Sequence, residues 1–229
     1  YYGAQKACEP IHAQYSYDDH SVWVVNSLYE PQNGLRVTAR VFNLDMTEKL
    51  NKTATVDVGP DGKTQALVLE WPEGLSRTYF LRLDLERDGQ PITSNFYWLS
   101  TAPDIPGEQG YTPDREFYVK PKSIMDFTAL AALPKVELDV TSSVEERGAE
   151  KVMRVKLSNP TPHLAFFNRL AVTRGADGPE VGPIFWSENC VSVLPGETRE
   201  VEGVFYAADL GDAKPVLKVE GWNAVARAR

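Results

Sequence analysis

The feature that most constrains this chain is an alternation of apolar and polar residues with a period of two. It is clearest in residues 77–87. The apolar positions and the polar positions between them are Tyr79, Leu81, Leu83 and Leu85, and Thr78, Arg82, Asp84 and Glu86. Successive side chains of a β-strand point to opposite faces, so this pattern predicts a strand with one buried face. Similar runs recur along most of the chain, in two sets of about seven separated by turn residues, which predicts an all-β protein made of two antiparallel β-sandwiches.

The chain is predicted to divide into four parts. Residues 1–100 form a first sandwich, which starts with a short helical stretch over residues 1–9 that Pro10 ends. Residues 101–133 form a connector, rich in proline and without a sustained period, followed by a short helix with Asp126 as its N-cap. Residues 134–224 form the second sandwich, and residues 225–229 are a tail without a core pattern that is expected to fray.

One turn of the second sandwich is specified residue by residue. Pro195-Gly196-Glu197 separates two alternating runs, residues 191–194 and 201–205. Proline presets a negative φ and glycine accepts a positive one, so the triplet predicts a tight turn between two strands.

Charge and length exclude several classes of partner. The 229 residues carry a formal net charge of −8, whereas nucleic acids and anionic membrane surfaces require a basic face. No apolar run approaches the roughly 20 residues that span a bilayer. The chain begins without methionine and is interpreted as a processed protein or an excised piece. Its two cysteines, Cys8 and Cys190, are predicted to be free thiols rather than a disulfide pair.

No catalytic constellation is visible in the sequence. It contains no phosphate-binding glycine loop, no paired-cysteine motif, no HExxH and no Gly-x-Ser-x-Gly elbow. Asp18-Asp19-His20 could form part of a metal site, but a β-turn whose aspartates bind backbone amides is favoured. We therefore expect no catalytic residue, no metal and no cofactor in this chain.

The tryptophans supply the candidate site. Trp23, Trp98 and Trp222 lie on alternating strands and are expected in the core. Trp186 precedes Ser187, Glu188 and Asn189, whose polar groups could bind hydroxyls, and Trp71 precedes a proline at the end of a strand. The candidate residues for contact with a sugar or with a neighbouring domain are Trp186, Ser187, Glu188, Asn189 and Trp71.

Several segments resemble glycoside hydrolase family 2, in the branch of exo-β-D-glucosaminidases and mannosylglycoprotein endo-β-mannosidases. They are residues 1–10, 17–19, 21–26, 96–100, 165–167, 186–189, 194–198 and 219–223. The resemblance implies that the chain is the pair of immunoglobulin-like domains that follows the catalytic (β/α)₈ barrel in such enzymes. Residues 1–9 would then be the end of the last barrel helix. The catalytic glutamates of the family lie in the barrel, and no position here corresponds to them.

The resemblance also implies a function. The chain would be a non-catalytic C-terminal region of a β-glucosaminidase or β-mannosidase, supporting the barrel and shaping the rim of its cleft. The parent enzyme would be secreted or periplasmic, and residues 165–170 look more like the mannosidase side of the branch. Two alternatives stay open: a carbohydrate-binding module that takes an oligosaccharide, and an adhesion or assembly module.

Overall fold

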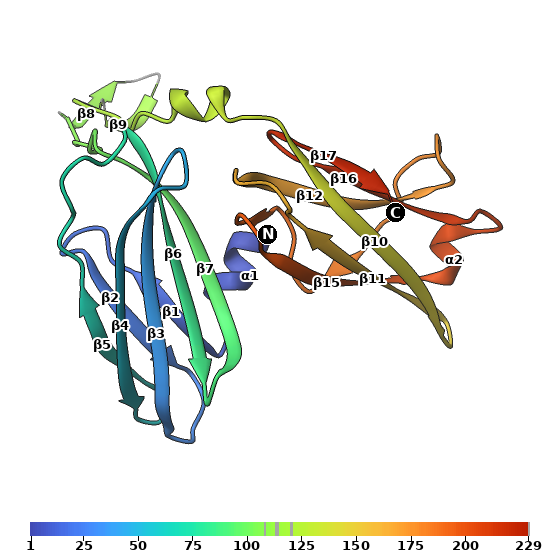
Figure 1. The fold of residues 1–229 in the computed structure, drawn as a ribbon, viewed down its shortest axis with the longest axis horizontal. Helices are drawn as coiled ribbons and strands as arrows, with labels where there is room; N and C mark the ends of the chain where they lie inside the picture. Colours follow the sequence, from blue (N-terminus) through green and yellow to red (C-terminus); the bar gives the residue numbers. More distant parts are fainter. Residues whose placement is uncertain (108, 113–114, 120, 229) are drawn as a thin grey trace. The chain divides into compact units, whose positions relative to one another are not determined.

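The structure is a computed structural model that describes the backbone of residues 1–107, 109–112, 115–119 and 121–228, and the side chains of residues 1–107 and 121–225. The predicted all-β class is confirmed. The chain folds into two compact units (Figure 1). One unit is Ala4–Ala132, which we call the first sandwich, and the other is Leu133–Arg229 together with Tyr1–Gly3, which we call the second sandwich.

The first sandwich consists of two antiparallel sheets. The smaller sheet has the order β1-β2-β5, and the larger has the order β4-β3-β6-β7. The strands are β1 (Ile11–Tyr15), β2 (Ser21–Asn26), β3 (Gln32–Asn43), β4 (Glu48–Val58), β5 (Gly62–Val68), β6 (Thr78–Arg87) and β7 (Gln90–Ser100). They follow α1 (Tyr2–Ala7), whose first two residues belong to the other unit.

The alternation in residues 77–87 places β6 at the centre of the larger sheet. Leu81, Leu83 and Leu85 are fully buried in one cluster with side chains from β2 and β3. Asp84, on the other face of β6, binds Arg40 of β3 at 2.9 Å. The period-two pattern therefore predicted correctly which face of β6 enters this core. It did not predict that Thr78, Phe80 and Arg82 on the other face are buried as well.

The connector has more regular structure than its sequence predicts. Its backbone forms an antiparallel hairpin, β8 (Gln109–Thr112) and β9 (Arg115–Val119), where the sequence shows no sustained period. The short helix is η1 (Thr128–Ala132), a 3₁₀ helix. Asp126 Oδ1 accepts hydrogen bonds from the Thr128 backbone N at 3.0 Å and from Thr128 Oγ1 at 2.7 Å, so Asp126 caps this helix as predicted.

The second sandwich contains one strand system that folds around a single core. Its order is β13-β15-β11-β10-β17-β16-β12-β14, and side chains from both halves of this order meet in the same buried cluster. The elements are β10 (Val136–Arg147), β11 (Glu150–Ser158), β12 (Ala165–Arg174), β13 (Phe185–Trp186), β14 (Val191–Val193), β15 (Thr198–Tyr206), α2 (Ala207–Leu210), β16 (Pro215–Glu220) and β17 (Ala224–Ala228).

The end of the chain differs from its prediction. Residues 225–229 were expected to fray, but residues 225–228 belong to β17, which pairs in parallel with β10, with Val136 opposite Ala224 and Val140 opposite Ala228. Arg229 lies outside the described residues. The backbone of β10 offers hydrogen-bonding groups along this edge, and pairing with them requires no apolar pattern in the partner strand. Hydropathy therefore could not reveal this strand.

The Pro195-Gly196-Glu197 turn has the predicted form. Gly196 has φ +71°, the left-handed conformation that glycine adopts without strain. Glu197 N donates to Leu194 O at 3.0 Å and closes the turn, and Leu194 N donates to the Glu197 carboxylate at 2.8 Å. In addition, Gly196 N donates to Asn159 O at 2.9 Å, which ties the turn to a second loop.

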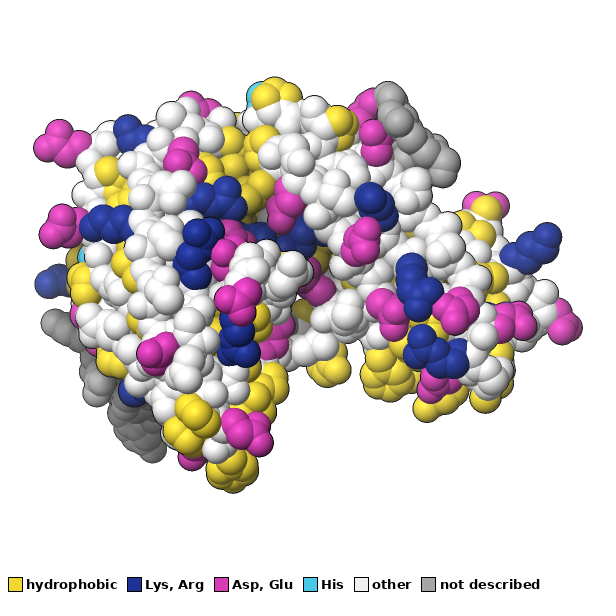
Figure 2. All heavy atoms as spheres, turned by 60° about the horizontal axis from the view of Figure 1, so that its bottom comes forward, with side chains coloured by type: hydrophobic (Ala, Val, Ile, Leu, Met, Phe, Trp, Pro, Cys, Tyr) yellow, Lys and Arg dark blue, Asp and Glu magenta, His cyan; other side chains and the backbone are white. Residues whose placement is uncertain are grey.

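No helix in the described part of the chain is long and apolar enough to cross a bilayer. On the face shown in Figure 2, Lys and Arg side chains lie interspersed with Asp and Glu side chains.

Candidate functional site

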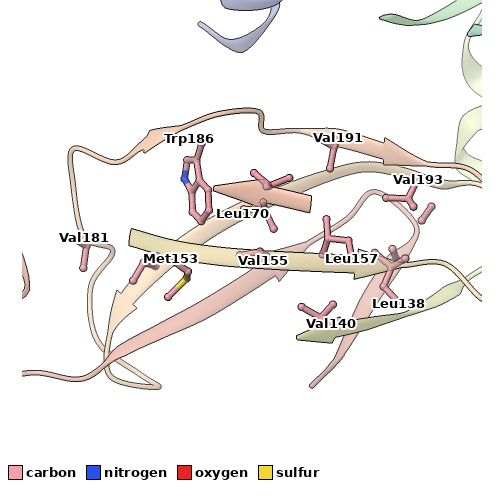
Figure 3. Packing of buried hydrophobic residues seen from close by; sticks show 14 of the residues in the cluster. Leu138, Val140, Met153, Val155, Leu157, Leu170, Val181, Trp186, Val191 and Val193 are labelled. Atoms are coloured by element: carbon pink, nitrogen blue, oxygen red, sulfur yellow. The ribbon is translucent and has the colours of Figure 1, made fainter. Parts of the chain in front are cut away.

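Trp186 belongs to the core of the second sandwich. Its side chain is 3% exposed and points into the cluster that contains Leu170 and Met153 (Figure 3). It covers Gly203 of β15, and a Cβ at Gly203 would lie only 2.5 Å from Trp186 Cε3. Trp186 was a candidate for contact with a sugar or a neighbouring domain, but its ring is buried, because the missing side chain at Gly203 leaves a space inside the sandwich that the indole fills.

Ser187 continues the pairing of β13 with β15. Its backbone N donates to Glu202 O at 2.7 Å, and Glu202 N donates to Ser187 Oγ at 3.0 Å. The side chain thus replaces a backbone acceptor at the point where the short strand ends. Ser187 itself is exposed.

Asn189 is buried and serves the backbone of β12. Its Oδ1 accepts from Leu170 N at 2.8 Å and from Cys190 N at 2.8 Å, and its Nδ2 donates to Leu170 O at 2.9 Å. An amide side chain carries both donors and an acceptor, so it can pair with both backbone groups of one residue as a neighbouring strand would. The amide oxygen and nitrogen of Asn189, which the sequence suggested could bind a sugar, are therefore engaged in hydrogen bonds within the protein.

The same role is shared by every asparagine after residue 133. All four are buried and bind backbone groups of other loops or strands. They are Asn159, Asn168, Asn189 and Asn223. The second sandwich therefore satisfies its interrupted strand ladders with asparagine amides.

Glu188 forms an ion pair with Arg199 of β15. Arg199 Nη2 contacts both carboxylate oxygens of Glu188, and Nη1 lies 3.4 Å from Glu197 Oε1. Both partners of the Glu188–Arg199 pair are mostly buried. Desolvation is the largest single influence and lowers the pKa of Arg199, but Glu188 and Glu197 together raise it by more, so the pKa of Arg199 is raised. Glu188 thus links the 186–189 segment to the Glu197 turn.

We expect Arg199→Met to lower the free energy of unfolding of the second sandwich by about 1.5–3 kcal/mol, because it removes the counter-charge of the mostly buried Glu188. Adding Glu188→Gln to Arg199→Met should recover part of this loss, since the uncompensated charge is then removed. Urea unfolding of the two single variants and the double variant measures the coupling. Arg154→Met is the control, because Arg154 pairs with Glu145 on the surface and should cost less than about 1 kcal/mol. Equal losses for Arg199→Met and Arg154→Met would contradict a buried role for the pair.

A cavity of about 220 Å³ lies beside the 186–189 segment in the second sandwich, with Arg169, Glu180 and Cys190 among its lining residues. Arg169 binds Glu180 and lies 3.3 Å from Glu220, so its positive charge is already compensated. Burial raises the pKa of the Cys190 thiol, which keeps it protonated and weakly nucleophilic at neutral pH. Cys8 and Cys190 are both free thiols, as predicted.

Trp71 lies in a cluster of aromatic rings on the first sandwich. Its ring contacts Tyr79 edge-on at a centroid distance of 5.2 Å, Tyr15 at 5.8 Å and His20 at 5.4 Å. Tyr15 in turn contacts Tyr17 at 5.1 Å and Tyr97 at 5.9 Å. We call these six residues the aromatic shelf: Tyr15, Tyr17, His20, Trp71, Tyr79 and Tyr97.

Apart from Trp71, the shelf residues were not identified as candidates from the sequence. Tyr15 and Tyr17 are two residues apart, which places them on one face if the strand continues, and this was the available local signal. Tyr79 and Tyr97 lie on β6 and β7, and nothing in the sequence indicates that these strands bring them to Tyr15. The cluster is a product of tertiary contacts.

Asp18-Asp19-His20 forms the loop that carries part of the shelf. Asp19 Oδ1 accepts from Ser21 N at 3.0 Å and Ser21 Oγ at 2.5 Å, and Asp19 N donates to Asp18 Oδ1 at 3.0 Å. This is the turn with aspartate-to-backbone bonds that the sequence favoured. Among the residues that the structure describes, no group of three or more His, Cys, Asp or Glu side chains could hold a metal ion.

Two of the three tryptophans expected in the core are exposed. Trp222 is 57% and Trp98 is 38% exposed, whereas Trp23 is half-buried with Lys63 Nζ 4.9 Å from its ring centroid. Trp222 lies beyond Glu220, where β16 ends, so the strand alternation no longer controls its direction. Its ring contacts Phe166 edge-on at 6.5 Å. Trp98 lies within β7 and is still exposed, so a position on an alternating run does not by itself predict burial.

Two family models match the chain, one on each sandwich. The model described as a mannosidase Ig/CBM-like domain matches residues 18–102, and the exo-β-D-glucosaminidase Ig-fold domain matches residues 116–224. Together they cover most of both sandwiches. They agree with the predicted pair of immunoglobulin-like domains.

Curated relatives match over nearly the whole chain. An exo-β-D-glucosaminidase of Amycolatopsis orientalis is 36% identical over 230 residues, which cover 97% of this chain and 22% of the relative. An exo-β-D-glucosaminidase of Streptomyces avermitilis is 36% identical over 233 residues, which cover 97% of this chain and 25% of the relative. The chain thus spans about a quarter of the length of these relatives.

A solved structure has a similar fold. The crystal structure of the Amycolatopsis orientalis exo-chitosanase CsxA superposes with a TM-score of 0.89 at 34% sequence identity. The superposition covers 98% of this chain and 27% of that one.

Proposed function

The chain belongs to the immunoglobulin-fold domains of the exo-β-D-glucosaminidase and mannosidase type, in the glycoside hydrolase family 2 branch, and we propose that it serves as the C-terminal, non-catalytic region of a larger β-glucosaminidase. The observation that carries the proposal is the extent of the match. Both sandwiches align along their length with exo-β-D-glucosaminidases, which contain about three times as much further chain.

The contacts of the second sandwich support a structural role for the 186–189 segment. Asn189 binds Leu170, Ser187 binds Glu202, and Glu188 binds Arg199. With these groups engaged internally, the segment is a rigid part of the sandwich, suited to hold a neighbouring domain in place. The partner we propose is the catalytic domain of the same polypeptide.

The proposed substrate class is β-linked glucosamine. The second sandwich matches the domain model of exo-β-D-glucosaminidases, and the two bacterial relatives above bear that name. β-Mannosides are the competing class, supported by the model that matches the first sandwich. Assays of the parent enzyme on p-nitrophenyl β-glucosaminide and on p-nitrophenyl β-mannoside separate the two classes.

The proposal predicts different results for the chain alone and for the longer enzyme that contains it. We expect the isolated chain to release no p-nitrophenol above the blank from either substrate. We expect deletion of the region to lower the melting temperature of the longer enzyme, because surface buried between neighbouring domains becomes exposed. Turnover by the isolated chain, or a deletion that leaves melting temperature and activity unchanged, would overturn the proposed role.

A further inference from the structure

The aromatic shelf of the first sandwich combines a buried base with exposed rings. Tyr15 and Tyr79 are buried and form the base, whereas Trp71 and His20 are half-buried and Tyr17 is 56% exposed. The edge-on contacts among these rings fix their orientation. Rings that are already ordered lose little conformational entropy when a ligand covers them.

The loops that carry the exposed rings are acidic. Residues 16–21 and 69–76 contain four carboxylates and no Lys or Arg: Asp18, Asp19, Glu70 and Glu73. All four are exposed. Lys49 reaches the second loop from β4, since its Nζ would lie 3.2 Å from a Cβ at Gly74. The carboxylates outnumber this one cation, so the surface around the shelf favours a positively charged ligand.

Titration of the shelf residues agrees with this charge pattern at neutral pH. The hydrogen bonds from Ser21 lower the pKa of Asp19, which keeps the carboxylate ionised. Burial raises the pKa of Tyr79 to about 12 and also raises the pKa of Tyr17, so both phenols stay neutral. The shelf therefore presents the neutral phenols of Tyr17 and Tyr79 beside the ionised carboxylate of Asp19.

We propose that the aromatic shelf is a binding site for sugars that carry a free amine, with Trp71 and Tyr17 against the apolar face of the sugar ring and Asp18 and Asp19 beside its ammonium group. Ammonium groups are attracted both to aromatic faces and to carboxylates, and a sugar ring has an apolar face that stacks on an indole. The choice of glucosamine as this sugar rests on the proposed function. The shelf and its charge do not depend on it.

The test is a titration of the whole chain with fully deacetylated chitosan oligosaccharides, followed by tryptophan fluorescence and by calorimetry. We expect saturable binding whose affinity falls as salt rises, because the charges lie on the surface and are screened. Trp71→Ala and Tyr17→Ala should each weaken binding by about tenfold or more. Trp98→Ala is the matched control: Trp98 is on β7 next to Tyr97, its side chain is on the opposite face of the strand, and affinity should change less than about twofold.

A second comparison isolates the charge. The Asp18→Asn and Asp19→Asn double variant keeps the side-chain acceptors of the turn but removes both charges, so binding should weaken and its salt dependence should flatten. Fully N-acetylated oligosaccharides have the same ring without the ammonium group and should bind about tenfold more weakly. Equal affinity for acetylated and deacetylated sugars would overturn the proposal, as would no binding of the deacetylated sugar at millimolar concentration.

Loss of sugar binding can be distinguished both from unfolding of the first sandwich and from failure of the proposed structural role. If Trp71→Ala unfolds the first sandwich, as judged by circular dichroism, the exposed Tyr17→Ala variant decides the question. The proposed structural role is measured by deletion from the longer enzyme and involves no sugar binding by this chain. Failure of one therefore leaves the result of the other unchanged.

Discussion

Gly203→Ala should lower the free energy of unfolding of the second sandwich by about 1–3 kcal/mol, because it inserts a methyl group into filled space. The new Cβ would lie 2.5 Å from Trp186 Cε3 and 2.6 Å from Cζ3, closer than side-chain atoms can approach. The added carbon meets the body of a buried indole, and the indole cannot move without disturbing the core. If it were expelled, the loss would rise towards the roughly 3–5 kcal/mol of removing a buried Trp.

Hydrogen exchange can localise this effect. Amide protection should fall in β15 and β11, where Met153 is the register partner of Gly203, while the first sandwich keeps its protection. Gly59→Ala is the control, since a Cβ there meets nothing within 4 Å and the change should cost less than about 0.5 kcal/mol. Combining Gly203→Ala with Trp186→Leu should cost less than the sum of the two changes, because the smaller side chain makes room. An additive result would contradict the packing account.

Asn223→Leu should lower the free energy of unfolding of the second sandwich by about 3–5 kcal/mol, because it removes hydrogen bonds to two buried backbone groups and to a third that is partly buried. Asn223 is 3% exposed, and its Nδ2 donates to Pro134 O at 2.6 Å and to Leu164 O at 2.8 Å. Its Oδ1 accepts from Phe166 N at 2.8 Å. Leucine has a similar volume, so the loss would come from unsatisfied polar groups rather than from a cavity.

Urea unfolding of the whole chain measures this loss, and hydrogen exchange shows whether the amides of Leu164 to Phe166 open first. Asn33→Leu is the matched control, since Asn33 is exposed on the first sandwich and its replacement should stay within about 0.5 kcal/mol of the wild type. A loss at Asn223 no larger than that at Asn33 would show that the three hydrogen bonds contribute nothing net. Asn223 would then contribute to stability only through the volume that its side chain fills.

The candidate site shows where prediction from sequence stops. The sequence selected Trp71 and Trp186 for the same reason, an indole beside a strand end or a polar loop. The structure separates them: Trp186 fills the space above Gly203, and Trp71 joins a partly exposed aromatic shelf. The sequence near each tryptophan does not distinguish the two, because the burial of each ring depends on which residue of another strand lies opposite it.

The role of Asn189 could not be predicted for a related reason. Beside an aromatic residue, Asn189 has the composition expected of a sugar contact. Its amide instead binds both backbone groups of Leu170, nineteen residues away in sequence. A side chain that binds its own distant backbone and one that binds a ligand carry the same donors and acceptors, so composition could not separate these uses.

Local sequence patterns predicted most of the strands, the core-facing side of strands such as β6, and several turns, because these depend on interactions over a few residues. The alternation around Leu83 and the glycine of positive φ at Gly196 are of this kind. Tertiary structure alone decided the parallel pairing of β17, the burial of Trp186 and the assembly of the aromatic shelf around Trp71. Each of these depends on groups brought together from distant parts of the chain, and the geometry that joins them is set only when the sandwich closes.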